Sequence, residues 1–439
     1  LDFVAKLDDV RMNKAAVWRE GNFDEQGVDA AYGEAFARWG LDVATLDAAE
    51  AAARVRASAV RERLVQALYD WALANWYLGS ATKLNRVLAV ARLADESDDE
   101  VRRQLRGNVV LTDRAGLKAL AARPAASAAP PAEVILMYHQ LRGFGETDSA
   151  AALLTEAQHQ RPGDFWLNEQ LGQFYQSTKP ARTAEAVGFF RAGVALRPQT
   201  AVAHNNLGNA LASLGKEVEA EREYREAIRL KPDYALFHCN LATSLETLGK
   251  GVEAEREYRE AIRLKPNYPE AHYDLGLAHN LQAQAADAER EYREAIRLKP
   301  DYPEAHCNLG HVLRDGGRFR EALDELRRGH ELGTRNPQWK YPSAAWVKDC
   351  EQLVELDALL PTVLSGGAEP ADADAALGLA QVCGHTKRYA AAARLTAKSF
   401  ALSPALADDP GNGARYNAAC WSALAGRGQG IDAPADDAE

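Results

Sequence analysis

A short polar side chain recurs at a fixed interval through the middle of the chain. Asn206, Asn240, Asp274 and Asn308 are spaced 34 residues apart, and each stands directly before a leucine. An amide side chain offers N–H donors and a carbonyl acceptor, the same groups that a peptide unit presents. The chemistry available to this set is therefore hydrogen bonding to the backbone of another chain. Duplication of a repeat would copy the asparagine with it, so the same spacing could also arise without a binding role.

Four histidines at the same interval raise the question of a metal site. They are His204, His238, His272 and His306. If they lie on successive repeats, neighbouring histidines stand about 10 Å apart, the ordinary distance between packed helices. A zinc ion needs its ligands at about 2 Å, so these side chains cannot converge on one ion. We predict no metal site and expect the histidines to fill packing positions.

Motifs for catalysis are absent from the sequence. There is no GxSxG, HExxH, GK[ST], HRD or DFG motif, so neither a hydrolase nor a kinase site is expected. The paired Gly316 and Gly317 predict a turn between two helices. Oppositely charged residues four apart predict exposed ion pairs on helix surfaces, namely Glu221–Arg225, Glu255–Arg259 and Glu289–Arg293. We therefore expect no catalytic residues and no cofactor.

The regularly spaced asparagines and histidines must be positioned by a repeated structural unit. The stretch AEREYREAIRLKP occurs from Ala220 to Pro232, from Ala254 to Pro266 and from Ala288 to Pro300. A fixed period of 34 residues is the signature of a helix-turn-helix array. Diverged copies extend the pattern backwards to the prolines at 198 and 162, and forwards over 322–333 and 389–404.

The repeat unit resembles the tetratricopeptide repeat. In the unit that begins at Pro269, the residues that carry the resemblance are Leu275, Gly276, Ala288, Tyr292, Ala295 and Pro300. Small residues let two helices approach, an aromatic ring fills the remaining gap, and proline ends the second helix. Histidine stands here where the family often has tryptophan. The resemblance implies an all-α fold, a superhelical solenoid of antiparallel helix pairs whose first helices line a concave groove.

The resemblance also implies which residues bind a partner. In tetratricopeptide repeat proteins similar to O-GlcNAc transferase, asparagines at the position before the leucine hold the backbone of an extended peptide. With neighbouring groove positions included, the predicted peptide-binding residues of this chain are Asn205, Asn206, Asn209, Asn240, Tyr273, Asp274, Asn308 and His311. Asn205 stands where chaperone-binding repeats have a lysine, so capture of a C-terminal carboxylate is not expected.

A second resemblance extends over the whole chain. Residues 20–72, the array and residues 387–426 look like the region that follows the kinase domain in planctomycete-type Hanks serine/threonine kinases. This resemblance implies a bacterial chain that regulates a kinase or recruits its substrates, with the catalytic domain lying elsewhere. A third hypothesis is the repeat arm of a glycosyltransferase-like enzyme, which is disfavoured because these 439 residues contain no transferase motif.

Composition and the positions of helix-breaking residues predict five segments along the chain. They are a helical region over 1–122, an Ala/Pro linker over 123–131, the repeat array over 132–334, degenerate repeats and capping helices over 335–427, and a disordered tail over 428–439.

Charge and cysteine usage indicate the class of partner and compartment. The net charge is −11 and basic residues alternate with acidic ones, which argues against a nucleic-acid binder. Five cysteines form no CxxC pair, which fits a reducing compartment. No apolar run is long enough to span a membrane. We expect a cytoplasmic, non-catalytic scaffold that binds a protein or peptide and can self-associate. The kinase resemblance implies the alternative of a membrane tether through an upstream segment.

Overall fold

The structure, a computed structural model, describes residues 25–43, 45–95, 113–408 and 413–432, together with Phe3, Lys6, Leu7, Val10 and Gln104. Within these residues every regular element is a helix and none is a strand. The prediction of an all-α fold of consecutive helix pairs is confirmed. Over the same ranges, none of the helices combines the length and the apolar character that a membrane span requires.

The chain forms two compact units, unit 1 over residues 1–249 and unit 2 over residues 250–439. This division falls inside the predicted array of residues 132–334 and not at either of its ends. Each unit has its own clusters of buried apolar side chains.

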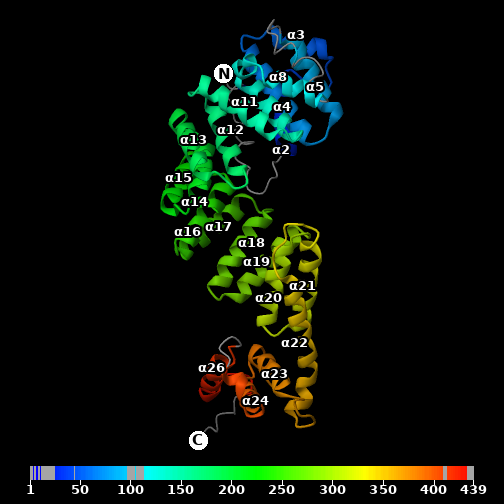
Figure 1. Ribbon diagram of the computed structural model, residues 1–439, viewed down its shortest axis with the longest axis vertical. Helices are drawn as coiled ribbons and strands as arrows, with labels where there is room; N and C mark the ends of the chain where they lie inside the picture. Colours follow the sequence, from blue (N-terminus) through cyan, green and yellow to red (C-terminus); the bar gives the residue numbers. More distant parts are fainter. Residues whose placement is uncertain are drawn as a thin grey trace. The chain divides into compact units, whose positions relative to one another are not determined.

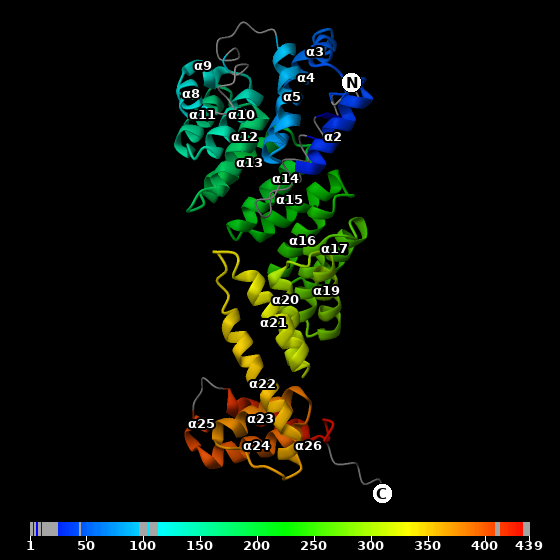
Figure 2. The same ribbon diagram turned by 90° about the vertical axis from the view of Figure 1, so that its right-hand side faces the viewer.

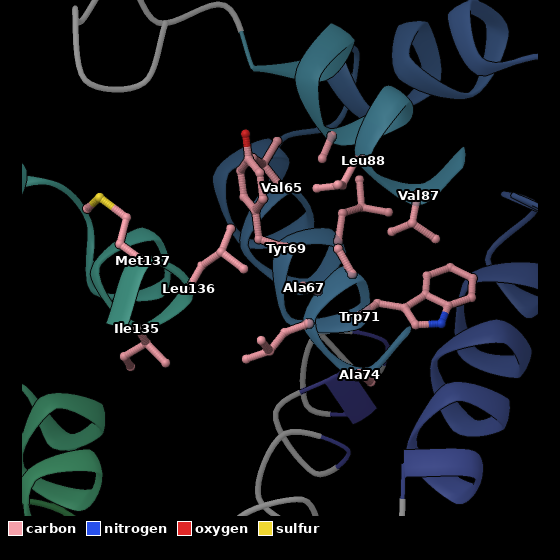
Figure 3. Close-up of a cluster of buried hydrophobic side chains, with 14 of the residues drawn as sticks. Val65, Ala67, Tyr69, Trp71, Ala74, Val87, Leu88, Ile135, Leu136 and Met137 are labelled. Atoms are coloured by element: carbon pink, nitrogen blue, oxygen red, sulfur yellow. The ribbon is translucent and has the colours of Figure 1, made fainter. Parts of the chain in front are cut away.

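Unit 1 begins with helices that share one core. They are α2 (Glu25–Arg38), α3 (Ala48–Arg56), α4 (Arg61–Tyr77), α5 (Ala81–Ala94), α8 (Arg114–Ala121) and α9 (Pro124–Ala128). Apolar side chains of α4 and α5 lie in one cluster with those of α10 (Pro131–Gly143), as Figure 3 shows. Trp71 stacks on Phe36 with ring centroids 5.4 Å apart, and its Nε1 donates to Asp29 Oδ1 at 2.7 Å. The core therefore satisfies the indole N–H of Trp71 while burying its ring.

Helix pairs then follow one another along unit 1, coloured cyan to green in Figure 1. They are α10 with α11 (Thr147–Gln160), α12 (Phe165–Ser177) with α13 (Thr183–Leu196), and α14 (Ala201–Ser213) with α15 (Glu217–Leu230), before α16 (Ala235–Thr247) ends the unit. The turn between α14 and α15 contains Gly215 at a φ of 73°. Glycine adopts this left-handed conformation without the cost that a Cβ atom imposes.

Unit 2 continues the same arrangement and then departs from it. Its helices are α17 (Gly251–Leu264), α18 (Pro269–Leu281), α19 (Ala285–Leu298), α20 (Pro303–Asp315), α21 (Phe319–Gly333), α22 (Ser343–Leu364), α23 (Ala373–His385), α24 (Tyr389–Leu402), α25 (Pro404–Asp408) and α26 (Ala414–Gly426). The 22-residue α22 packs on α21 and reaches α23 (Figure 2). The predicted turn after α20 is confirmed, with Gly317 at a φ of 76°.

The two helices of a repeat interlock where a glycine faces an aromatic ring. A Cβ atom placed on Gly208 would lie 2.6 Å from the ring of Tyr224, and one on Gly276 would lie 2.7 Å from Tyr292. Both tyrosines are buried. Because no larger residue fits under the ring, the glycine sets how closely the two helices approach.

The segment predicted as a linker, residues 123–131, is instead packed and partly helical. Helix α9 occupies it, and Ala126 and Ser127 are buried. Arg161, which directly follows α11, donates to the carbonyl oxygens of Ser127 and Ala129, each at 2.6 Å. The prolines that suggested a linker begin helices α9 and α10, where proline is tolerated because the first N–H groups have no helical partner.

The predicted disordered tail over 428–439 is ordered at its start. The carboxylate of Asp432 accepts hydrogen bonds from the backbone N–H groups of Ala390 and Ala391, at 3.3 and 2.8 Å, and so caps α24. The N–H of Ile431 donates to the carbonyl of Lys387 at 2.9 Å. Capping of a free helix end gives these residues a fixed place. Residues 433–439 lie outside the described residues.

Candidate functional site

A polar hollow lies between the first helices of successive repeats in unit 1. It has a volume of about 500 Å³, and we call it the unit 1 hollow. Its lining residues come from α12 to α16 and are Gln173, Gln176, Ala181, Thr183, Asn206, Asn209, Ala212, Ser213, Glu217, Tyr224, Asn240, Thr243, Ser244 and Thr247. Most of the lining residues carry an amide or a hydroxyl, so the hollow offers many hydrogen-bonding groups and little charge among exposed apolar atoms.

The structure brings three predicted residues to this hollow and buries a fourth beneath it. Asn206, Asn209 and Asn240 line the hollow, whereas Asn205 is fully buried and does not. Asn209 is half-buried, and its Oδ1 accepts the hydroxyl of Tyr224 at 2.8 Å. The amide N–H groups of Asn209 therefore remain for a ligand, because a side-chain amide has separate donors and acceptor.

The asparagines before the leucines contact the preceding repeat, an arrangement that we call repeat latches. Asn206 Nδ2 donates to Glu169 Oε2 at 2.9 Å, and Asn240 Nδ2 donates to Asn205 Oδ1 at 2.7 Å. Asn206 and Asn240 are 5% and 3% exposed. Such buried polar pairs hold neighbouring helices in register, since breaking one leaves an unpaired polar group. This latching role was not predicted from the sequence.

The remaining predicted residues lie in unit 2. Asn308 Nδ2 donates to the hydroxyl of Tyr273 at 3.1 Å, which is a third repeat latch. His311 packs against Trp346 of α22 with ring centroids 4.6 Å apart. Burial, with a contribution from Arg314, lowers the pKa of His311 to about 4, so its ring is neutral at pH 7. Asp274 is half-buried.

The acceptor of the Asn206 latch in unit 1 is a buried carboxyl group, that of Glu169. Glu169 on α12 is 2% exposed, and burial raises its pKa to about 8 although its hydrogen bond with Asn206 acts in the opposite direction. Its Oε1 has no hydrogen-bond partner. A Cβ atom on Gly193 would lie 2.5 Å from this oxygen, so glycine on α13 makes the room for the carboxyl. At pH 7 Glu169 is therefore mostly neutral.

The repeat histidines form a polar clip in addition to the packing role that the sequence predicts. His272 Nδ1 lies 2.7 Å from Glu291 Oε2, and its Nε2 lies 3.3 Å from the carbonyl oxygen of Pro266. Both partners are acceptors, so both ring nitrogens donate only when the ring is an imidazolium. The same arrangement occurs at His204 with Glu223 and Pro198, and at His306 with Glu325 and Pro300.

Replacing Glu291 by glutamine should lower stability more at pH 6 than at pH 9. Burial opposes the charge on His272, but its hydrogen bonds to Glu291 and Pro266, helped by the nearby Glu294, raise its pKa. A raised histidine pKa contributes stability below the unfolded value, about 6.5, and this is lost as pH rises through the folded value. We expect a loss of roughly 1–2 kcal/mol at pH 6 by urea unfolding. The exposed Glu185→Gln should show no pH-dependent loss, and equal losses of Glu291→Gln at both pH values would contradict the clip.

The outer face of the array carries the predicted ion pairs. Arg225 and Glu221 are 2.8 Å apart, and the two equivalent pairs, Arg259–Glu255 and Arg293–Glu289, measure 2.6 and 3.0 Å. The three pairs form as predicted, but their glutamate side chains are only 11%, 16% and 20% exposed, so the prediction of fully exposed pairs is wrong for the acidic partner. The cysteines at 239, 307, 350 and 383 are buried and form no disulfide, as expected for small apolar side chains. Over the described ranges, no group of three His, Cys, Asp or Glu residues could hold a metal ion.

The helix pairs, the glycine–aromatic contacts and the hollow between first helices define an α-solenoid of helix-pair repeats. Family models identify the repeat. The model described as TPR repeat matches residues 247–282 and 286–314, and the model described as Tetratricopeptide repeat matches residues 201–234. The central part of the chain therefore contains tetratricopeptide repeats, as the sequence resemblance predicted. These matches do not show the resemblance to kinase-associated regions, which stays a prediction.

Solved structures with helical repeats are similar at a low level. YrrB, described as a TPR protein with an unusual peptide-binding site, is 19% identical with a TM-score of 0.35, over 45% of this chain and 98% of that chain. TTC0263, a thermophilic TPR protein of Thermus thermophilus, is 22% identical with a TM-score of 0.37, over 42% and 98%. PilF of Pseudomonas aeruginosa is 19% identical with a TM-score of 0.35, over 54% and 90%. No curated protein matches the sequence. At these levels the similarities say nothing about ligands or partners.

Proposed function

We propose that this chain is a non-catalytic interaction scaffold that holds an extended peptide segment of a partner protein in the unit 1 hollow. The observation that supports this most is the composition of the hollow, where amide and hydroxyl side chains gather in a space of about 500 Å³. A main chain in extended form presents alternating N–H and C=O groups that such side chains can satisfy.

Two amides in the hollow have hydrogen-bonding capacity to spare. Asn240 is 3% exposed and its Oδ1 has no hydrogen-bond partner, while Asn209 uses only its Oδ1. The Oδ1 of Asn240 is itself buried, so of the two amides Asn209 is the one that we expect to contact a ligand directly. Asn206 lines the hollow and Asn205 lies outside its lining, and both side chains latch neighbouring repeats, so we assign them a positioning role in binding.

The proposed site is tested by blocking the hollow. Ala212 lines it, and Ala212→Arg would fill the space with a long side chain that a helix tolerates. Peptides selected from a random 12-residue display library on the whole chain should bind at least about tenfold more weakly to Ala212→Arg, as measured by fluorescence anisotropy. The matched control is Ala119→Arg on the exposed surface of α8, which should bind as the unchanged chain does.

The outcomes separate the proposal from its alternatives. Circular dichroism and urea unfolding should show both arginine variants folded, because both alanines lie outside the core. Peptides that bind Ala212→Arg undiminished would place the binding surface elsewhere, and a library that yields no binder would remove the proposed function. The chain alone should also transfer no phosphate from ATP, since the kinase hypothesis assigns it no catalytic residue.

A further inference from the structure

The charge of the unit 1 hollow indicates the kind of segment that it accepts. Glu217 is the one side chain with a formal charge among the lining residues that the structure describes, and lysine, arginine and histidine are absent from that lining. A hollow with a single negative charge attracts cationic groups and disfavours carboxylates. It therefore differs from sites that clamp a C-terminal carboxylate, which need basic side chains.

The carboxylate of Glu217 is fixed in place but not neutralised. It lies in the first turn of α15, and its Oε2 accepts the hydroxyl of Ser244 at 2.6 Å. Ser244 of α16 is 2% exposed, so the anchor is buried and belongs to the neighbouring repeat. A half-buried carboxylate held from one side by a hydroxyl has its other oxygen available to an incoming donor.

Neighbouring glutamates on the same helix are paired, which sets Glu217 apart. Glu219 contacts Lys216 at 3.1 Å and Arg191 at 2.8 Å, and Glu221 contacts Arg225 at 2.8 Å. Among the ion pairs of the described residues, none includes Glu217. The one carboxylate that faces the hollow is thus the one left without a cation from its own chain.

We propose that the unit 1 hollow selects an extended segment that places a lysine or arginine side chain against Glu217, with uncharged residues on either side. This inference rests on the proposed function, because it names the chemistry of the segment bound at that same site. The amides and hydroxyls bind the main chain of the segment, and the Glu217 carboxylate pairs with one of its basic side chains. The same charge disfavours acidic segments and free C-terminal carboxylates.

Synthetic peptides test this selectivity directly. The starting peptide is one that was selected for binding to the whole chain. At each of its positions it is made with lysine, glutamine or glutamate. The affinity of each version is measured by fluorescence anisotropy in 50 mM and 300 mM salt. At one position lysine should bind about fivefold to tenfold tighter than glutamine, with glutamate weakest. This advantage should shrink at the higher salt concentration, since a partly exposed pair is screened.

Two variants assign the selectivity to one residue. Glu217→Gln keeps the shape and the hydrogen bond with Ser244, and it should bind the lysine and glutamine peptides equally. Glu219→Gln, on the same helix but outside the hollow, should keep the full preference for lysine. A preference that survives Glu217→Gln, or the lack of any preference in the unchanged chain, would overturn the inference.

The test also distinguishes this inference from the proposed function beneath it. If neutral peptides bind and are blocked by Ala212→Arg, but charge has no effect, the hollow is a peptide site without the selectivity inferred here. If no peptide of any charge binds, both the site and its selectivity are overturned.

Discussion

Replacing Gly208 by alanine should destabilise unit 1 by about 1–3 kcal/mol, the usual cost of overpacking a core. The added methyl group would lie 2.6 Å from the ring of Tyr224, closer than carbon atoms can approach. Tyr224 is 3% exposed and its hydroxyl is bonded to Asn209, so the ring cannot move aside without losing that hydrogen bond. Urea unfolding followed by circular dichroism measures the loss.

The matched control for Gly208→Ala is Gly188→Ala. Gly188 lies within α13, and a Cβ atom there would meet no other atom within 4 Å. Alanine has the higher helix propensity, so Gly188→Ala should raise stability by about 0.5–1 kcal/mol. Equal gains from both substitutions would show that the glycine–aromatic contact does not set the helix spacing.

The helix pairs were predictable because their determinants are local and repeated. A 34-residue period, a glycine on one helix and a tyrosine on the next describe one supersecondary unit, and the structure places Gly276 under Tyr292 as that unit requires. The segment over 123–131 was not predictable in the same way. Its packing depends on Arg161, which lies more than 30 residues away at the end of α11 and donates to the backbone of Ser127 and Ala129.

The sequence reveals the regularly spaced asparagines, but it does not reveal which residues their side chains contact. Asn206 reaches Glu169, which lies 37 residues away on a diverged repeat, whereas Asn240 and Asn308 reach residues 35 positions away, Asn205 and Tyr273. The acceptor is a carboxyl, an amide and a hydroxyl in turn. Because the partner changes from repeat to repeat, no sequence pattern marks the asparagine as a latch.

The histidine clips had a signal in the sequence that could have revealed them. A glutamate stands 19 residues after His204, His272 and His306, and in each case the two side chains meet. A constant offset between a basic and an acidic residue in successive repeats indicates contact between the first and second helices. The family resemblance predicts only a packing role here, because tryptophan is common at this position in the family.

Replacing Glu169 by glutamine should remove a pH dependence of stability that the buried carboxyl imposes. Burial raises the pKa of Glu169 to about 8, whereas a glutamate in the unfolded chain titrates near about 4.3. Between these values the folded chain holds a proton that the unfolded chain releases, so the free energy of unfolding falls as pH rises. Glutamine cannot ionise and keeps the oxygen that accepts the N–H of Asn206.

The expected result is a stability difference between Glu169→Gln and the unchanged chain that grows by roughly 2–4 kcal/mol in favour of the variant from pH 5 to pH 8. Urea unfolding at several pH values measures it. The raised pKa values of His204 and His272 make their clips weaken over this range too, but both clips are present in both chains and cancel in the difference. Glu156→Gln, on the exposed surface of α11, should leave the slope unchanged. If Glu169→Gln follows the unchanged chain at every pH, Glu169 is ionised in the folded state, and the Asn206 latch is then a hydrogen bond to a carboxylate.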